Sequence, residues 1–91
     1  MSKIDIHRSH DLGLEQAREK IGGLEAQLKQ RYGVKLAWQG NEANVKGTGV
    51  TGTLRVSATD VDLNLKLGLM LRPVAGKIRA GIERGVDDAL A

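Results

Sequence analysis

The sequence contains no cysteine and no phenylalanine, and it has one tryptophan, one tyrosine and one proline. The absence of cysteine excludes disulfide bonds, thiolate catalysis and cysteine-ligated zinc, and it suits a reducing compartment. Because aromatic residues make up only 2% of the chain, leucine, isoleucine, valine and alanine must build the core. No apolar run approaches the roughly 20 residues that a membrane span needs, and no charged leader precedes an apolar segment.

A run of alternating apolar residues is the strongest pattern in the chain. Between positions 61 and 71 every second residue is valine or leucine, and polar residues fill the alternate positions up to Lys66. Because alternate side chains of a β-strand point to opposite faces, this run predicts a strand with one buried and one wet face. Gly68 is the expected break, after which Leu69–Leu71 leave the strand.

Other patterns predict four more strands and two helices. Spacings of three and four predict one helix that runs to about Arg31, with Gly33 as its left-handed C-terminal cap. Ser9 and Asp11 are both candidates for its N-cap, and Asp11 is preferred. After Pro73 an apolar stripe from Val74 to Leu90 predicts the second helix. Spacings of two predict the remaining strands, at 3–8, 34–38, 43–46 and 50–58.

Strand direction decides the expected order of the sheet. If the first helix reverses the chain and hairpins connect the later strands, the first strand is antiparallel to the fifth. Antiparallel pairing is the commoner kind, and a place beside the first strand makes the leucine-rich strand interior. We therefore predict one α+β domain over residues 1–91, β-α-β-β-β-β-α, with a five-stranded antiparallel sheet in the order 1-5-4-3-2. Both helices are expected on one face, and the other face is expected to be open to water.

Two patterns that look like active-site motifs have plainer explanations. Residues 47–52 match GxGxxG, but predicted strands flank them, whereas the nucleotide-binding motif lies between a strand and a helix. His7 lies on a strand and His10 on the following turn, so their side chains need not converge, and no third histidine completes a metal site. We therefore expect a protein that is not an enzyme, with no catalytic residue, metal or cofactor.

Basic residues on the open face make nucleic-acid binding an alternative function. Lys35, Lys46, Arg55 and Lys66 are all expected on that face. Sheets that bind single strands stack bases on aromatic side chains, and this face is predicted to have none, since Trp38 belongs to the apolar side. A solvated face is the favoured interpretation.

The end of the leucine-rich strand is the candidate partner surface. Apolar alternation fails there, because Gly68 and Met70 occupy positions that had been polar. A small core cannot bury both sides, and a leftover apolar patch commonly marks an interaction surface. The candidate partner residues are Leu69, Met70, Leu71, Gly81 and Gly85, and the candidate basic rim is Arg72, Lys77 and Arg84. Alternatively, the patch closes a homodimer or lies under the final helix, and the two glycines allow close packing inside the domain.

Four short motifs occur in order: His10-x-Leu12, Trp38-x-Gly40, Gly49-Val50-x-Gly52 and Leu67-Gly68-x-x-Leu71. Together they give a sequence that resembles the bacterial polyhydroxyalkanoic acid system protein family over nearly its whole length. The resemblance implies a cytoplasmic, non-catalytic accessory protein of polyester storage, and we expect it to bind a granule or an apolar acyl ligand through its helix-covered side. It also implies a reduced helix-grip fold, in which a curved antiparallel sheet holds helices. The alternatives are a small homodimeric interaction module and a nucleic-acid-binding domain that uses the open basic face.

Overall fold

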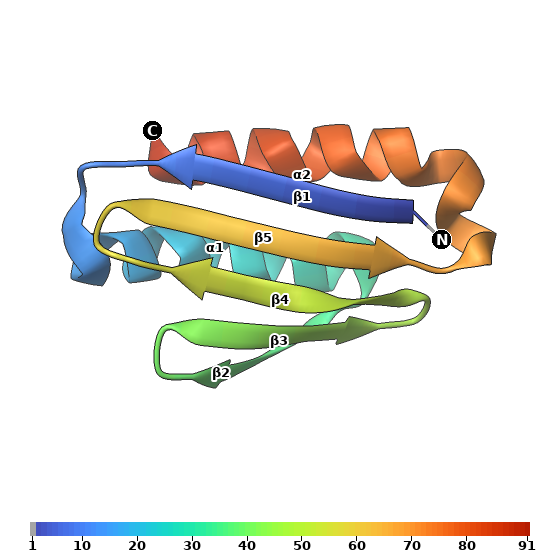
Figure 1. Cartoon of the computed structure of the whole chain (residues 1–91), viewed down its shortest axis with the longest axis horizontal. Helices are drawn as coiled ribbons and strands as arrows, with labels where there is room; N and C mark the ends of the chain where they lie inside the picture. The colour runs from blue at the N-terminus through green and yellow to red at the C-terminus, as the bar shows by residue number, and fades with distance from the viewer. Residues whose placement is uncertain (1) are drawn as a thin grey trace.

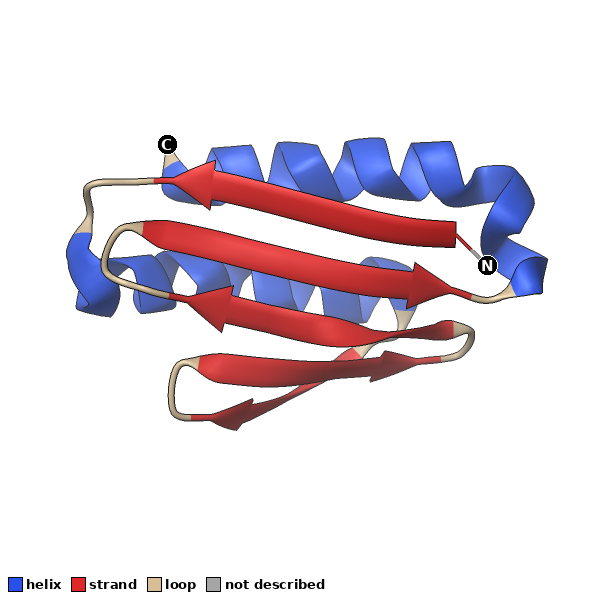
Figure 2. Ribbon diagram, in the orientation of Figure 1, coloured by secondary structure: helices blue, strands red, loops and turns tan. Residues whose placement is uncertain are grey.

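The computed structural model describes residues 2–91 of the chain. These residues form one sheet with two long helices packed on one of its faces (Figure 1, Figure 2). None of these helices is long and apolar enough to cross a membrane. In chain order the elements are β1 (Ser2–Ser9), α1 (Gly13–Tyr32), β2 (Lys35–Gln39), β3 (Glu42–Gly47), β4 (Val50–Val56), β5 (Asp60–Leu67), the 3₁₀ helix η1 (Leu69–Val74) and α2 (Ala75–Leu90).

The sheet is antiparallel throughout, and its order is β1-β5-β4-β3-β2, as the sequence predicts. The leucine-rich strand β5 therefore lies inside the sheet, with β1 on one side and β4 on the other. The pairing register places Lys3 opposite Lys66 across β1 and β5, and Thr51 opposite Lys66 across β4 and β5. Side chains that are distant in the sequence thus lie in rows across the sheet.

The core lies between the sheet and the two helices. Leu63 and Leu67 of β5 are completely buried, and so is Leu54 of β4. No polar or charged side chain among residues 3–91 is fully buried, so hydrophobic burial is the main stabilising contribution to the interior. The helices complete the core with Ala17, Ile21, Leu24 and Leu28 of α1 and with Ile78, Ile82 and Val86 of α2.

The start of α1 differs from the sequence prediction. Leu12 is the N-cap residue, not Asp11, and no side chain forms a capping hydrogen bond there. Instead, the imidazole of His10 fixes the entry to the helix: its Nδ1 accepts the Leu12 N–H at 3.1 Å, and its Nε2 lies 3.0 Å from the carbonyl oxygen of Ser57. Short oxygen-bearing side chains are the usual cap signals, and a histidine in this role carries no such signal.

The end of one strand differs from the prediction, and the end of another is confirmed. The predicted strand at 50–58 is shorter in the structure: β4 stops at Val56, and Ala58 is exposed in the following bend. β5 stops at Leu67 and η1 starts at Leu69, so the predicted break at Gly68 is confirmed. The chain then forms η1 instead of entering the second long helix directly, and Val74 consequently lies outside the buried stripe.

Candidate interaction surface

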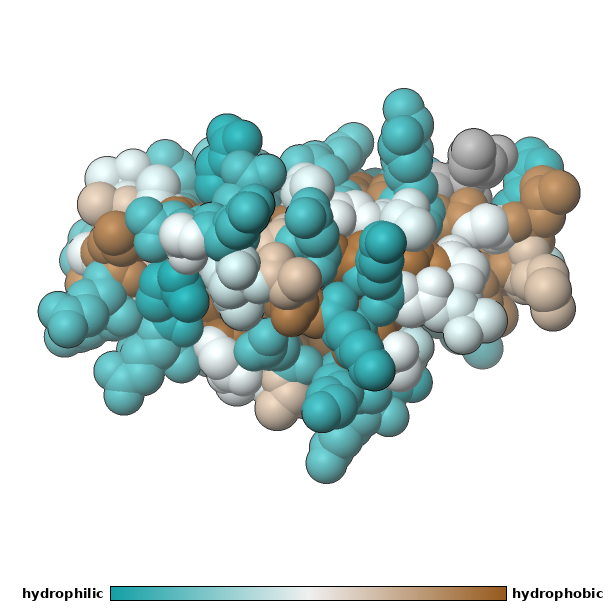
Figure 3. All heavy atoms as spheres, turned by 90° about the horizontal axis from the view of Figure 1, so that it is seen from below, coloured by the Kyte–Doolittle hydropathy of each residue, from teal (hydrophilic) through white to brown (hydrophobic). Residues whose placement is uncertain are grey.

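Three large apolar side chains of η1 point into solvent at one end of the molecule. Met70 is 92% exposed, Leu69 71% and Val74 40%, and these three residues are called the apolar tip. They are the large hydrophobic residues that stand exposed within residues 2–91. Figure 3 shows hydrophobic atoms reaching the surface at the right-hand end, where Figure 1 places η1.

The local structure of η1 explains the exposure of the tip. Gly68 is extended at its start, Pro73 lies inside it, and none of its six residues is fully buried. Leu71 alone turns back, half-buried against the core. Leu71 therefore does not belong to the exposed part of the predicted partner surface, because successive side chains of a 3₁₀ helix point in different directions.

Two of the three predicted rim residues lie beside the apolar tip. Arg72 belongs to η1 itself and Lys77 to the first turn of α2, and both are exposed. Arg84 lies nine residues beyond Ala75, about 14 Å along the helix at 1.5 Å per residue. Arg84 is therefore too far along α2 to belong to this rim.

Gly81 and Gly85 face α1. A Cβ built on Gly81 would lie 2.8 Å from the hydroxyl oxygen of Tyr32, and one built on Gly85 would lie 2.9 Å from Cδ1 of Leu24. Cβ atoms in proteins do not approach other atoms so closely, so both glycines allow α2 to pack tightly against α1. This placement corresponds to the internal-packing interpretation and takes both residues out of the candidate surface.

Four lysines form a row across the open face of the sheet. Lys3 is opposite Lys66, Lys66 is opposite Thr51, Thr51 is opposite Lys46, and Lys46 is opposite Lys35. All five side chains are exposed. Since neighbouring strands lie about 4.8 Å apart, the row crosses about 19 Å of the sheet. The four lysines are called the lysine row.

The lysine row is part of a wider separation of charge along the strands. When each helix and strand is divided at its midpoint, the half that holds η1 contains nine basic and two acidic residues, and the other half contains five basic and nine acidic residues. These halves, called the basic half and the acidic half, carry formal charges of +7 and −4, which add to the net charge of +3. The charged residues of the basic half are Lys3, Lys29, Arg31, Lys35, Lys46, Lys66, Arg72, Lys77 and Arg79, with Asp5 and Glu25.

Two arginines of the acidic half have ion-pair partners, whereas the lysines of the row do not. Nε of Arg8 donates to Asp87 at 2.7 Å, and Nη2 of Arg55 donates to Glu42 at 3.2 Å. No member of the lysine row forms an ion pair with any of residues 2–91. The positive charge of the row is therefore available to an external anion.

The two histidines do not share a site. Nδ1 of His7 is hydrogen-bonded to Asp62 on the neighbouring strand, and its Nε2 lies 3.3 Å from Asp60. The hydrogen bond and the charge of Asp62 raise the pKa of His7 above its ordinary value of 6.5. His10 is engaged with the turn before α1. Within residues 2–91, no group of three or more histidine and acidic side chains is arranged to hold a metal ion.

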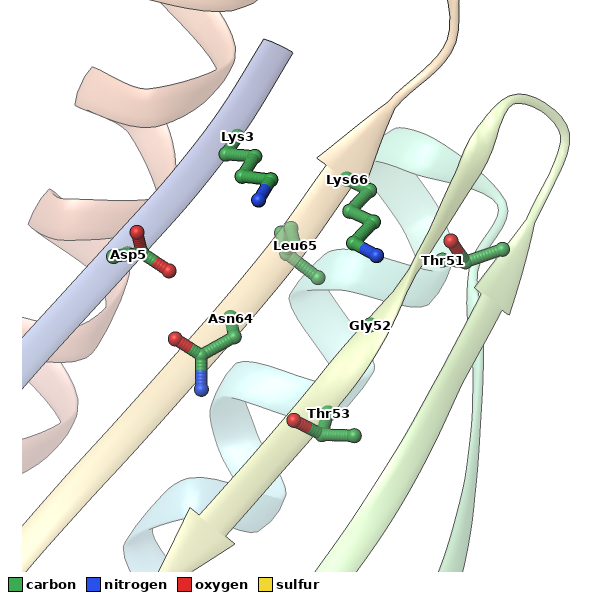
Figure 4. Close-up of a pocket in the computed structure, with 8 residues that line it drawn as sticks. All are labelled: Lys3, Asp5, Thr51, Gly52, Thr53, Asn64, Leu65 and Lys66. Atoms are coloured by element: carbon green, nitrogen blue, oxygen red, sulfur yellow. The ribbon is translucent and has the colours of Figure 1, made fainter. Parts of the chain in front are cut away.

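A shallow hollow of about 440 Å³ lies on the open face beside Lys3 and Lys66. Figure 4 shows these two lysines on β1 and β5, with Asp5 on the β1 side. Hydrogen-bond donors dominate, because two ammonium groups, two hydroxyls and one amide line the hollow together with a single carboxylate. The complete lining consists of Lys3, Asp5, Thr51, Gly52, Thr53, Asn64, Leu65 and Lys66.

An apolar space between the helices and the sheet is too small for an organic ligand. Its volume is about 20 Å³, and Leu28, Val45 and Ile82 are among the residues that line it. One water molecule already requires about 10–15 Å³ of such volume. An acyl chain therefore does not fit between the helices and the sheet in this structure.

The structure thus defines a small α+β domain in which one sheet carries two helices, with an exposed apolar tip and a lysine row at one end. The chain belongs to the family described as "Putative polyhydroxyalkanoic acid system protein", whose model matches residues 4–90. This match confirms the family that the four short motifs indicate. Comparison with curated proteins and with solved structures finds no match.

Proposed function

We propose that the protein is a non-catalytic accessory protein of bacterial polyhydroxyalkanoate storage and attaches to the surface of the polyester granule in the cytoplasm. The observation that carries the proposal is the apolar tip, where Met70 and Leu69 are 92% and 71% exposed beside Arg72 and Lys77. Apolar side chains gathered in one exposed place commonly mark an interaction surface. The family description supports a polyester system as the setting.

Binding through the apolar tip alone is expected to be weak. Burial of one leucine or methionine side chain contributes about 1.5–3 kcal/mol, so Leu69 and Met70 together contribute about 3–6 kcal/mol. Loss of translational and rotational freedom costs about 4–15 kcal/mol. Stable attachment to a granule therefore requires further contacts beside the tip.

A free acyl ligand has less support than a granule as the partner. The space between the helices and the sheet holds about 20 Å³, so an acyl chain would lack an enclosed binding site there. The apolar tip leads directly into α2, so it borders the helix-covered side that the sequence indicates. The proposed contact is accordingly at the edge of that side.

Co-sedimentation with isolated polyhydroxyalkanoate granules tests the proposal. The variant Leu69→Ser/Met70→Ser removes most of the apolar tip without changing the charge. The matched control is Ala26→Ser/Ala80→Ser, which alters two exposed helix positions away from the tip. We expect the wild type and the control in the granule pellet and the tip variant in the supernatant, with circular dichroism showing that all three are folded.

Two outcomes contradict granule attachment through the tip. In the first, wild-type protein stays in the supernatant when granules are present. In the second, the tip variant sediments as well as the wild type. Size-exclusion chromatography of the same proteins tests the homodimer alternative: a wild-type dimer that becomes a monomer in Leu69→Ser/Met70→Ser assigns the tip to a second copy of the chain.

A further inference from the structure

We propose that the lysine row binds a layer of anionic phospholipid headgroups, while the apolar tip enters the layer beside it. This inference rests on the proposed function, because it names the chemistry of the surface that the tip meets. It assigns a second set of binding residues, on the open face of the sheet, that the proposed function does not use.

Folding alone does not account for the lysine row. Like charges directly opposite each other destabilise a sheet, and Lys3–Lys66 and Lys46–Lys35 are two such pairs. The corresponding row of the acidic half holds His7, Asp62, Arg55 and Glu42 in order across the strands, so each carboxylate there lies opposite a basic side chain. The same sheet therefore pairs opposite charges at one end and collects like charges at the other, which favours a negatively charged partner for the lysine row.

Headgroup phosphates match the donors on this part of the face. The ammonium groups of the row lack ion-pair partners, and Thr51, Thr53 and Asn64 add hydroxyl and amide donors around the hollow. The carboxylate of Asp5 would repel an anion at one edge of the hollow. Because Asp5 pairs with Asn64 in the next row of the sheet, the lysine row itself keeps four positive charges.

A lipid layer fits this surface better than a nucleic acid does. Single-stranded nucleic acids bind sheets by stacking bases on aromatic side chains. Trp38 is engaged on the helix side, where the guanidinium of Arg18 lies 3.9 Å from the centroid of its ring and Glu25 accepts its indole N–H at 3.1 Å. The phosphate backbone of a nucleic acid offers no apolar surface for the tip to contact. A lipid interface, in contrast, accepts both cationic and apolar side chains.

The tip and the row are close enough to meet one surface together. Lys66 is the residue before the end of β5, and Leu69 starts η1 immediately after the break at Gly68. The end of β5 and η1 lie at the same end of the molecule (Figure 1). Each basic residue held near an anionic lipid surface strengthens binding by about a factor of five, so the row supplies the additional affinity that the tip lacks.

Sedimentation with lipid vesicles tests the inference. One set of vesicles consists of phosphatidylcholine alone and another of equal parts phosphatidylcholine and phosphatidylglycerol. The row variant is Lys46→Gln/Lys66→Gln, and the control is Lys20→Gln/Arg84→Gln, which removes the same charge from exposed positions of the acidic half. We expect wild type to bind the anionic vesicles, less tightly as salt rises, and the row variant to bind about 30-fold more weakly. The control is expected to change by about twofold or less, because its positions lie farther from the surface.

Three results overturn the inference. If wild type binds the two kinds of vesicle equally, lipid charge plays no part in binding. If the row variant and the control lose vesicle binding to the same extent, the lysine row is not the binding surface. Tighter binding of a single-stranded DNA oligonucleotide at the same salt, lost in the row variant, assigns the row to nucleic acid.

Granule assays with the same variants separate this inference from the proposed function. If the row variant still sediments with granules while the tip variant does not, the result supports granule attachment through the tip and contradicts the lipid contact of the lysine row. If wild type binds anionic vesicles but not granules, the proposed function fails and the lipid contact stands.

Discussion

Gly52 of β4 lies so close to Asn64 of β5 that a Cβ built on the glycine would be 2.0 Å from the asparagine carbonyl oxygen. The same Cβ would lie 2.8 Å from Cδ2 of Leu65. Rotation of a side chain cannot relieve the first contact, because the oxygen belongs to the backbone. The glycine that completes the GxGxxG pattern is therefore required by strand packing.

Replacement of Gly52 by alanine is accordingly expected to destabilise the protein. The free energy of unfolding should fall by about 3 kcal/mol, the upper part of the range for overpacked sites, as measured by urea denaturation. Gly23→Ala is the control, because Gly23 is exposed on α1 and its Cβ would meet no atom within 4 Å. That variant should gain up to about 1 kcal/mol from helix propensity. A loss of equal size in both variants would show that the contact with Asn64 is not the cause.

Stability should depend on pH through His7. Its pKa is raised by Asp62, so its contribution is fully present below about pH 6.5 and is lost as the pH rises through the raised pKa. The pKa of Asp60 is lowered, first by the hydrogen bond from Thr59, so its contribution is present above about pH 3.8 and is lost as the pH falls through the lowered pKa.

The pKa shifts of His7 and Asp60 together make the folded state most stable between about pH 3.8 and pH 6.5. In His7→Gln, the melting temperature should fall less than in wild type as the pH rises above 6.5, and NMR titration of wild type should give His7 a pKa above 6.5. A titration midpoint at or below that value would contradict the contact with Asp62.

Trp38 should report the contact between α1 and the β2–β3 hairpin. Arg18 stacks on its ring, and Nη1 of Arg18 donates to the carbonyl of Gly40 at 2.5 Å. In Arg18→Ala the tryptophan emission should shift to longer wavelength, and stability should fall by about 0.5–1 kcal/mol. Lys20→Ala is the control on the same helix. Unchanged emission in Arg18→Ala would mean that the guanidinium does not cover the ring in solution.

The sequence predicts the sheet more completely than it predicts the candidate surface. One buried face imposes a period of two on β5, and this period together with strand direction is enough to predict its interior place. The lysine row depends instead on the register between strands. Lys3 and Lys66 are 63 positions apart in the sequence and lie on different strands, so spacing along a single strand does not reveal that they are neighbours.

Local geometry sets the remaining differences. Leu69 and Met70 are exposed, whereas Leu71 is half-buried, because a 3₁₀ helix replaces the extended continuation of β5. Arg84 falls outside the basic rim because helix rise separates residues that a count along the sequence places near one another. The imidazole of His10 takes part in the turn before α1, a role for which the sequence gives no recognised signal.

The two charged halves make the molecule an electric dipole directed along its longest dimension, which is 37 Å. Near a negatively charged layer such a dipole experiences a torque before any atoms touch. The protein would therefore arrive already turned, with η1 leading and the acidic half trailing in solvent. Salt would slow capture by screening this torque, so the association rate should be more sensitive to ionic strength than the rate of release.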